Sequence, residues 1–187
     1  MLYTLKDCRR GEAAIYRTTV DISEKNGRFT FAFTAEHTSF YCPFDGYNDL
    51  HSDGDACEIL IGSDPERKCY YEIEVSAEGK LMLAKMTYGG VDEEGAPILG
   101  LEFVEDCFVE STFSVIDGGY TATLSFDRKD ILTGDGEVFF NAYRLETDGG
   151  EKDKHLFALF PTMRPKFHAP TYFECIDNYT GKTEAKQ

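Results

Sequence analysis

Two short segments, GDACEILI at residues 54–61 and CYYEIEV at residues 69–75, decide the fold of this chain. Each segment alternates side chains with a period of two, which is typical of a β-strand that buries one face. The residues between them, GSDPERK at 62–68, are rich in turn formers. The two segments therefore predict an antiparallel β-hairpin.

The alternation also predicts which side chains share a face of the hairpin. One face is apolar and consists of Cys57, Ile59, Ile61, Tyr71, Ile73 and Val75. Glu58, Glu72 and Glu74 then gather on the opposite face. Carboxylates that are close together on one sheet face repel one another unless a cation, a metal or the hydroxyls of a ligand compensate. This acidic face is therefore a candidate binding site.

The remainder of the chain predicts more strands, separated by turns rich in Gly, Asn and Asp. Strands are expected at residues 29–33, 80–86, 101–108, 112–116, 120–126 and 138–145. One capped helical turn is expected at 127–132, and long irregular loops are expected at 36–55 and 147–171. This pattern predicts an all-β fold: an antiparallel β-sandwich with jelly-roll or immunoglobulin-like layers, long loops and at most one or two short helical turns.

Length and composition predict one domain. The chain has 187 residues, of which 42% are hydrophobic, and we place the domain at residues 1–178 and a polar C-terminal tail at 179–187. Asp and Glu number 34 against 19 Lys and Arg, a net charge of −15. This excess argues against nucleic acid and against an anionic membrane as partners. The negative charge suits neutral or cationic ligands. The sequence makes no prediction about the oligomeric state.

The N-terminal segment MLYTLKDCRR lacks the apolar core of a signal peptide, and no long apolar run is present. The six cysteines are scattered and contain no C-x-x-C pair. These features predict a cytoplasmic protein with reduced cysteines. A leader removed before residue 1 would instead predict secretion.

Four segments, in this order along the chain, resemble family 9 carbohydrate-binding modules and their DOMON-like relatives. They are residues 54–61, residues 70–75, FFNAYR at 139–144 and FHAPTYF at 167–173. The resemblance implies a sandwich of antiparallel sheets that recognises sugars without catalysing a reaction. Such modules are often attached to glycoside hydrolases, and structural calcium occurs among them. The resemblance therefore predicts a carbohydrate ligand and non-catalytic carbohydrate binding in support of glycoside hydrolysis.

The resemblance also implies which residues form the site. Glu58 and Asn141 fall at positions that hydrogen-bond sugar hydroxyls in the family. Phe167 falls where the family places one of two tryptophans that sandwich the sugar ring. This chain contains no tryptophan, and Glu74 stands in place of a basic sugar-binding residue. The alternative for Phe167 is that its ring covers the end of the core.

Three further residues join the candidate ligand-binding set. Tyr143 is expected on the same strand face as Asn141, and His168 at the rim of the site. Arg144 is retained as a candidate, although a regular strand would place it on the opposite, apolar face. There it would form a buried ion pair, for example with a hairpin carboxylate, whereas a bulge would bring it to the site.

The first long loop contains candidate calcium ligands. Five oxygen donors, Asp45, Asn48, Asp49, Asp53 and Asp55, lie within eleven residues, and such groups suit calcium. Of these we select Asp49, Asp53 and Asp55 as metal ligands. The alternative is that Asp and Asn serve the turns of the loop. No organic cofactor is expected.

Three other functions remain open at this point. The domain could be an interaction module that has lost sugar binding, as the missing tryptophans suggest. It could be a glycoside-active enzyme that uses two of the three hairpin glutamates, although the sequence contains no other catalytic motif. It could also bind haem, through Met82 or Met86 with His155 or His168.

Overall fold

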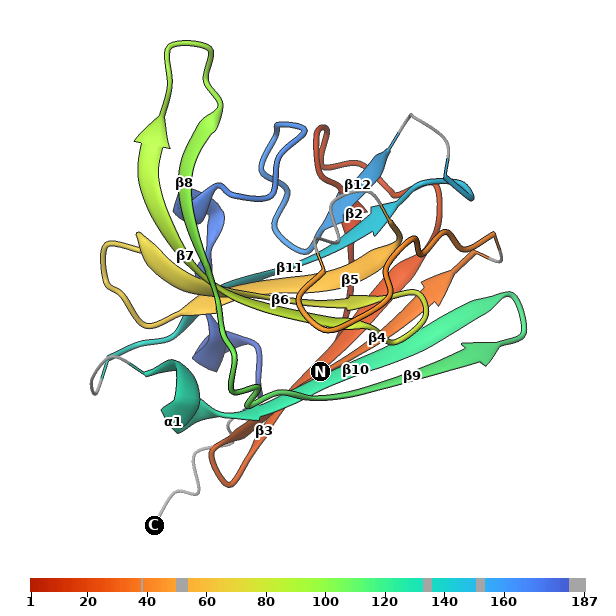
Figure 1. Cartoon of the computed structure of the whole chain (residues 1–187), viewed down its shortest axis with the longest axis horizontal. Coiled ribbons are helices and arrows are strands. Elements are labelled where there is room, and N and C mark those ends of the chain that lie inside the picture. The colour runs from red at the N-terminus through yellow and green to blue at the C-terminus, as the bar shows by residue number, and fades with distance from the viewer. Residues whose placement is uncertain (38, 50–53, 133–135, 151–153, 182–187) are drawn as a thin grey trace.

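The computed structural model describes residues 1–37, 39–49, 54–132, 136–150 and 154–181. They form two antiparallel β-sheets packed on one another, which confirms the predicted all-β sandwich (Figure 1). The smaller sheet has the strand order β1 (Leu2–Thr4), β3 (Thr18–Lys25), β4 (Arg28–Glu36), β10 (Gly119–Asp127) and β9 (Glu110–Ile116). The larger sheet has the order β2 (Lys6–Asp7), β12 (His155–Ala158), β11 (Phe139–Glu146), β5 (Ala56–Gly62), β6 (Cys69–Ser76), β7 (Leu81–Val91) and β8 (Pro97–Phe103), and β13 (Glu174–Cys175) pairs with β11.

Strands β5 and β6 form the predicted hairpin in the middle of the larger sheet. Their register places Ile59 opposite Ile73 and Glu58 opposite Glu74. Asp64 fixes the turn, because its Oδ2 accepts hydrogen bonds from the backbone N–H groups of Lys68 at 2.8 Å and Cys69 at 2.9 Å. A buried carboxylate pair thus lies directly across two hydrogen-bonded strands.

The main core lies between the two sheets. The apolar face predicted for the hairpin belongs to it, because Cys57, Ile59, Ile61, Ile73 and Val75 are all fully buried there. The smaller sheet contributes mainly aromatic rings, Phe29, Phe31 and Phe33 from β4 and Tyr120 and Phe126 from β10. This division of faces follows from the period of two along each strand.

A second apolar cluster lies on the other face of the larger sheet. Its buried members include Leu60, Tyr70, Tyr143, Ala158 and Phe173, and Leu156 and Phe167 pack against them. The chain after β12 therefore folds over this face and includes the 3₁₀ turn η2 (Pro170–Tyr172). The next 3₁₀ turn, η3 (Ile176–Asn178), contributes Ile176 to the main core. This covering is what buries the glutamates on the acidic face of the hairpin.

Several element boundaries differ from the prediction. The strand expected at 101–108 lies at 97–103, and the loop expected at 147–171 contains β12. Strands β1, β2, β3 and β13 have no counterpart in the sequence prediction. The expected helical turn is present as α1 (Arg128–Ile131). Tyr179, which we assigned to the tail, packs on the rings of Tyr3 and Phe160 at centroid distances of 5.4 and 5.0 Å.

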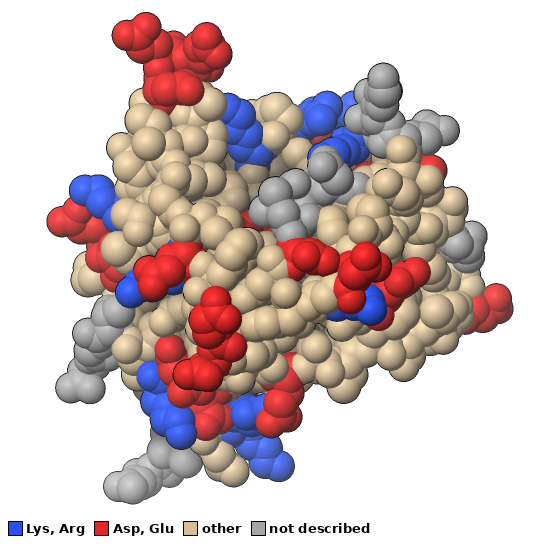
Figure 2. All heavy atoms as spheres, viewed as in Figure 1, with Lys and Arg blue, Asp and Glu red and all other residues tan. Residues whose placement is uncertain are grey.

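On the face of the molecule seen in Figure 2, acidic side chains are spread out rather than gathered in one patch. On the face seen in Figure 2 they are interspersed with basic residues, and a group stands at the tip of the β7–β8 hairpin, where Asp92, Glu93 and Glu94 are exposed. Glu58, Glu72 and Glu74 on strands β5 and β6 are buried instead, as are Asp55 and Glu146. No helix in the described part of the chain is both long enough and apolar enough to cross a membrane.

Candidate functional site

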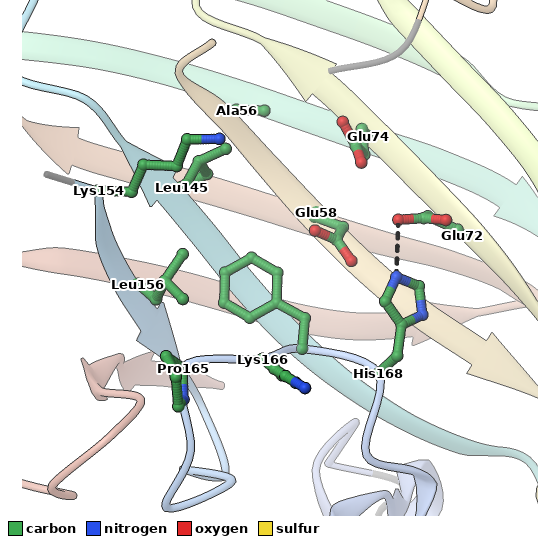
Figure 3. Close-up of a pocket in the computed structure, with 11 residues that line it drawn as sticks. Ala56, Glu58, Glu72, Glu74, Leu145, Lys154, Leu156, Pro165, Lys166 and His168 are labelled. Carbon is green, nitrogen blue, oxygen red and sulfur yellow. Dashed lines mark ion pairs between the residues drawn. The ribbon is translucent and has the colours of Figure 1, made fainter. Parts of the chain in front are cut away.

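A pocket opens over the acidic face of the β5–β6 hairpin. Its volume is about 260 Å³. Strands β5 and β6 supply its floor, β11 and β12 supply Leu145 and Leu156 at one side, and the segment 165–168 crosses over it (Figure 3). Acidic, aromatic and aliphatic side chains therefore meet in one cavity.

Three carboxylates form the floor of the pocket. Glu58 is 5% exposed, and Glu72 and Glu74 are each 6% exposed. Each can offer one oxygen such that all three oxygens lie within 4.8 Å of one another. Oε1 of Glu58 is buried and has no hydrogen-bond partner among the described residues. The acidic face predicted from the sequence thus exists, and it is more enclosed than strand alternation alone would indicate.

Burial and mutual repulsion act on these carboxylates. Burial raises the pKa of Glu58 well above its ordinary value, and the neighbouring charges of Glu72 and Glu74 raise it further. The pKa of Glu74 is raised first by burial and then by Glu72, and His168 only partly opposes this shift. The pocket is therefore an environment in which a positive charge on a ligand would relieve an electrostatic cost.

Phe167 supplies the aromatic surface of the pocket. Its ring stacks on Tyr143 with a centroid distance of 4.3 Å and an interplanar angle of 26°. The Tyr143 hydroxyl donates a hydrogen bond to the backbone carbonyl of Phe167 at 2.9 Å. Tyr143 is fully buried, so it holds Phe167 in place and does not line the pocket. Its pKa is raised, mainly by burial and then by the charge of Glu58.

His168 closes the side of the pocket next to Glu72. Its Nε2 lies 3.4 Å from Oε1 of Glu72, the contact drawn in Figure 3. Its Nδ1 is 2.9 Å from the hydroxyl of Tyr70. Burial and then the charge of Glu72 raise the pKa of Tyr70, which keeps this hydroxyl protonated and able to donate to Nδ1.

Asn141 does not reach the pocket. It is fully buried, and its amide nitrogen donates to the backbone carbonyl of Phe160 at 2.8 Å. Its Oδ1 accepts the backbone N–H groups of Ala142 at 2.9 Å and Phe160 at 3.0 Å. These contacts tie Phe160, in the segment after β12, to β11. Asn141 therefore supports the fold around the pocket instead of making the predicted contact with a sugar hydroxyl.

Arg144 lies on the opposite side of the larger sheet from the pocket. It is fully buried, forms an ion pair with Glu146, and donates from Nη1 to Oγ1 of Thr18 at 2.9 Å and to the carbonyl of Glu36 at 3.1 Å. Strand alternation therefore holds without a bulge at this position. The ion pair expected with a hairpin carboxylate is made with Glu146 instead, and the placing of Arg144 at the ligand site is corrected.

The predicted calcium ligands serve separate backbone contacts. Asp49 accepts the N–H groups of Asp45 at 2.8 Å and Gly46 at 3.0 Å, which is typical of a turn. Asp55 is fully buried and accepts from Tyr41 and Thr147. Asp53 lies outside the described residues. Within the described ranges, two groups of three His or acidic side chains could share an ion, and neither includes Asp49 or Asp55. Calcium binding by this loop stays a prediction that these contacts do not favour.

Sequence reasoning missed several pocket residues. Lys154, Leu156, Pro165 and Lys166 line the pocket but carry no motif. The one feature of the sequence that could have placed Lys166 in the pocket is its position next to Phe167. Its Nζ donates to the carbonyl of Gly95 at 3.1 Å, so its charge is directed toward the β7–β8 hairpin. In Figure 3 Lys154 lies beside Leu145 and Ala56 at the other end of the pocket.

This arrangement suits the binding of a small polar ligand that has an apolar face. An aromatic ring offers a surface for C–H groups, and the carboxylates are strong acceptors for hydroxyl or ammonium donors. Binding pockets of this kind combine apolar walls with a few convergent polar groups. The Met and His residues considered for haem do not favour that ligand, because Met82 and Met86 are buried and His155 bonds Asp148 at 2.7 Å.

The sequence matches no known family profile and no curated protein. Solved structures do match. A Bacteroides uniformis protein provisionally described as carbohydrate-binding superposes with a TM-score of 0.71 at 14% identity, over 92% of this chain and 84% of its own. A family 9 carbohydrate-binding module from Caldicellulosiruptor kristjanssonii in complex with cellotriose superposes with a TM-score of 0.60 at 7% identity, over 92% of this chain and 76% of its own.

A family 9 module from the same organism in complex with glucose superposes with a TM-score of 0.58 at 9% identity, over 92% of this chain and 82% of its own. At such low identities the similarity concerns the fold. The chain therefore has the β-sandwich fold of family 9 carbohydrate-binding modules, in agreement with the resemblance of its four segments.

Proposed function

We propose that this protein binds carbohydrate, without catalysis, in the pocket over the β5–β6 hairpin. The observation that carries the proposal is the position of Phe167, which is stacked on Tyr143 at 4.3 Å and lines the same pocket as Glu58, Glu72 and Glu74. An aromatic platform next to strong hydrogen-bond acceptors is what a pyranose ring requires. The shared fold with sugar-binding modules supports the proposal, which includes a supporting role in glycoside hydrolysis.

The arrangement of the glutamates favours binding over hydrolysis. In glycosidases two carboxyl groups flank the scissile bond, and different environments move their pKa values apart. Here Glu58 and Glu74 are direct cross-strand neighbours on one floor, and the pKa of each is raised. We therefore expect no release of reducing sugar from oligosaccharides. Release that is lost in Glu58→Gln would contradict this part of the proposal.

The experiment that tests sugar binding is a thermal-shift screen against mono- and oligosaccharides. A ligand at about 100 times its Kd stabilises the folded state by about 2.7 kcal/mol, so a binding sugar raises the unfolding midpoint. Phe167→Ala removes the platform and should weaken binding by about 2 kcal/mol, or roughly 30-fold in Kd. Phe103→Ala is the matched control, because Phe103 is exposed on β8 and does not line the pocket.

Two results would overturn the proposal. One is a flat response of the midpoint to every sugar, which would favour an interaction domain that has lost sugar affinity. The other is a sugar-dependent rise that Phe167→Ala and Phe103→Ala leave equally intact, because binding would then lie elsewhere on the molecule.

A further inference from the structure

A second pocket lies next to the pocket over the β5–β6 hairpin, which is called the first pocket below. The second pocket has a volume of about 270 Å³, nearly equal to the 260 Å³ of the first. Lys166 and His168 line both pockets, whereas Pro165 and Phe167 line only the first and Arg164 only the second. The segment 164–168 therefore separates two neighbouring cavities of similar size, which suits a saccharide of two units.

The lining of the second pocket is basic. Its polar side chains are Tyr88, Arg164, Lys166, His168, Thr171 and Tyr172. Among the described residues that line it, none is Asp or Glu, in a chain whose net charge is −15. Resting on the sugar-binding function proposed above, we propose that the second pocket binds an acidic group, a carboxylate or a sulfate, on the sugar unit next to the one held over Phe167.

Arg164 provides a free guanidinium on an anchored backbone. Its side chain is exposed, and no hydrogen bond or ion pair joins its guanidinium to another described residue. Its backbone carbonyl accepts a hydrogen bond from Oγ1 of the buried Thr162 at 3.1 Å. A guanidinium presents a planar fork of N–H donors that binds a carboxylate or a sulfate through two parallel hydrogen bonds. Arg164 is therefore the main candidate for contact with an acidic group.

Lys166 adds a second positive charge to this pocket. Its Nζ donates to the backbone carbonyl of Gly95 at 3.1 Å, and Gly95 also lines the second pocket. In Figure 3 the Lys166 side chain points away from the three glutamates of the first pocket. An ammonium group has three N–H donors, so two remain for a ligand. Oγ1 of Thr162 also bonds the carbonyl of Lys166, at 2.8 Å, and thereby holds both basic residues.

The other polar residues of the second pocket contribute hydroxyl groups. Both ring nitrogens of His168 are engaged elsewhere, because Nε2 lies 3.4 Å from Oε1 of Glu72 and Nδ1 lies 2.9 Å from the hydroxyl of Tyr70. The remaining donors are the hydroxyls of Tyr88, Thr171 and Tyr172, and Val91 and Pro97 add apolar surface. Positive charge, hydroxyl donors and apolar walls together fit an acidic sugar better than a bare inorganic anion.

The acidic tip of the β7–β8 hairpin does not neutralise these cations. Figure 2 shows acidic side chains at the tip and basic side chains beside the hairpin. Oδ1 of Asp92 accepts the backbone N–H groups of Glu94 at 3.0 Å and Ala96 at 2.7 Å, so this carboxylate serves its own turn. Charges that are exposed at a tip are screened by salt, whereas an anion in the pocket would bond Arg164 and Lys166 directly.

The test is a calorimetric titration at pH 7 with disaccharides that differ in an acidic group. Cellobiose is compared with cellobiouronic acid and with cellobiose sulfate, and galactobiose with digalacturonic acid. We expect at least one acidic disaccharide to bind about tenfold or more tightly than its neutral partner. The carboxylated and sulfated sugars show which acidic group is preferred. The preference should decrease at high salt, because salt screens charges.

Variants locate the source of this preference. Arg164→Gln should lower the affinity for the acidic disaccharide about tenfold and leave the affinity for its neutral partner within about threefold. Lys166→Gln should also weaken binding of the acidic sugar, whereas Phe167→Ala should weaken binding of both sugars. The matched control is Arg17→Gln, because Arg17 is exposed and lies outside both pockets.

The possible outcomes separate this inference from the proposed function. Acidic disaccharides that bind no more tightly than their neutral partners, or a preference that Arg164→Gln leaves unchanged, would overturn the inference and leave sugar binding intact. Tight binding of an acidic sugar that Phe167→Ala does not weaken would also overturn it, because the two pockets would then act independently. The thermal-shift screen with neutral sugars decides the proposed function separately.

Discussion

Two groups of buried carboxylates, on opposite faces of the same sheet, differ in how the protein neutralises them. Glu146 forms an ion pair with Arg144 and lies 2.9 Å from Nδ1 of His37. Burial and the charge of Asp55 raise the pKa of Glu146, and Arg144 and His37 only partly oppose that shift. Around Glu58, in contrast, burial and the nearest charges all raise the pKa. The charge of Glu146 is therefore partly offset by basic groups within the fold, whereas the neighbouring charges that act on Glu58 are acidic.

This difference indicates how to separate structural from functional carboxylates in a sandwich. A buried charge that serves the fold has its partners within the chain. A cluster of like charges that faces a pocket is a candidate for binding. The comparison can be tested by removing members of each group, because the two groups predict effects of opposite sign on stability.

The largest effect is expected for Arg144→Met. This change leaves Glu146 buried without its main counter-charge and should lower the free energy of unfolding by about 3–5 kcal/mol. Urea denaturation measures the difference. Arg17→Met is the matched control, because Arg17 is 64% exposed and pairs with Glu36 at the surface, where such pairs contribute less than about 1 kcal/mol. Similar stabilities for the two variants would refute the structural role of Arg144.

A smaller loss of stability is expected for Asp55→Asn. Asp55 lies three residues before Glu58, but its oxygens accept from the backbone of Tyr41 at 2.7 Å and from the N–H and hydroxyl of Thr147 at 2.7 and 2.6 Å. Replacing one acceptor by a donor should cost about 2 kcal/mol, measured by urea denaturation. Asp49→Asn, at a half-buried turn, should cost less than Asp55→Asn does, because Asp55 is fully buried. A larger loss of stability for Asp49→Asn than for Asp55→Asn would show that the hydrogen bonds of Asp55 contribute little to the fold.

Glu58→Gln should have the opposite sign. The neutral amide relieves repulsion from Glu72 and Glu74, so the free energy of unfolding at neutral pH should rise by about 1 kcal/mol. Glu102→Gln, at an exposed position on β8, should change it by less than about 0.5 kcal/mol. If Glu58→Gln lowers stability as strongly as Asp55→Asn, the carboxylate of Glu58 has partners within the fold.

The smallest expected effect is a change in the pH profile of stability. The pKa values of Glu58 and Glu74 are raised in the folded state above the ordinary value of 4.5, so the folded state retains protons that the unfolded state has released. Their contribution is fully present below about pH 4.5 and is lost as the pH rises through the raised values. In the described part of the chain, the charged or titratable groups near them are Cys8, Tyr70, Glu72, Tyr143, Lys154, Lys166 and His168.

Unfolding curves from pH 4.5 upward test this expectation. The double variant Glu58→Gln with Glu74→Gln should show a shallower decline of stability than the original protein, because two of the groups that release protons on unfolding have been removed. An unchanged slope in the double variant would mean that these carboxylates are already ionised and compensated in the folded protein.

The sequence was sufficient for the parts of the site that depend on local alternation. The period of two placed Glu58, Glu72 and Glu74 on one face and turned Arg144 to the other, and the structure confirms both. The hairpin turn and the sandwich also follow from local patterns. These are properties that neighbouring residues on one strand determine among themselves.

The rest of the site depends on contacts that local patterns do not encode. Asn141 and Tyr143 bond the carbonyls of Phe160 and Phe167, which lie 19 and 24 residues away in the sequence. Only the folding of the segment after β12 over the sheet reveals that these polar groups are occupied. The same segment contributes Pro165 and Lys166 to the pocket, and no periodicity could place them there.

The central claim is that a sugar binds over the β5–β6 hairpin, and NMR can locate it directly. Amide chemical shifts of the labelled protein are followed during titration with each sugar of the thermal-shift screen. We predict that a binding sugar perturbs the signals of Glu58, Glu72, Phe167 and His168 most strongly, because these residues line the pocket. Perturbations confined to other parts of the molecule, or none with any sugar, would contradict the account.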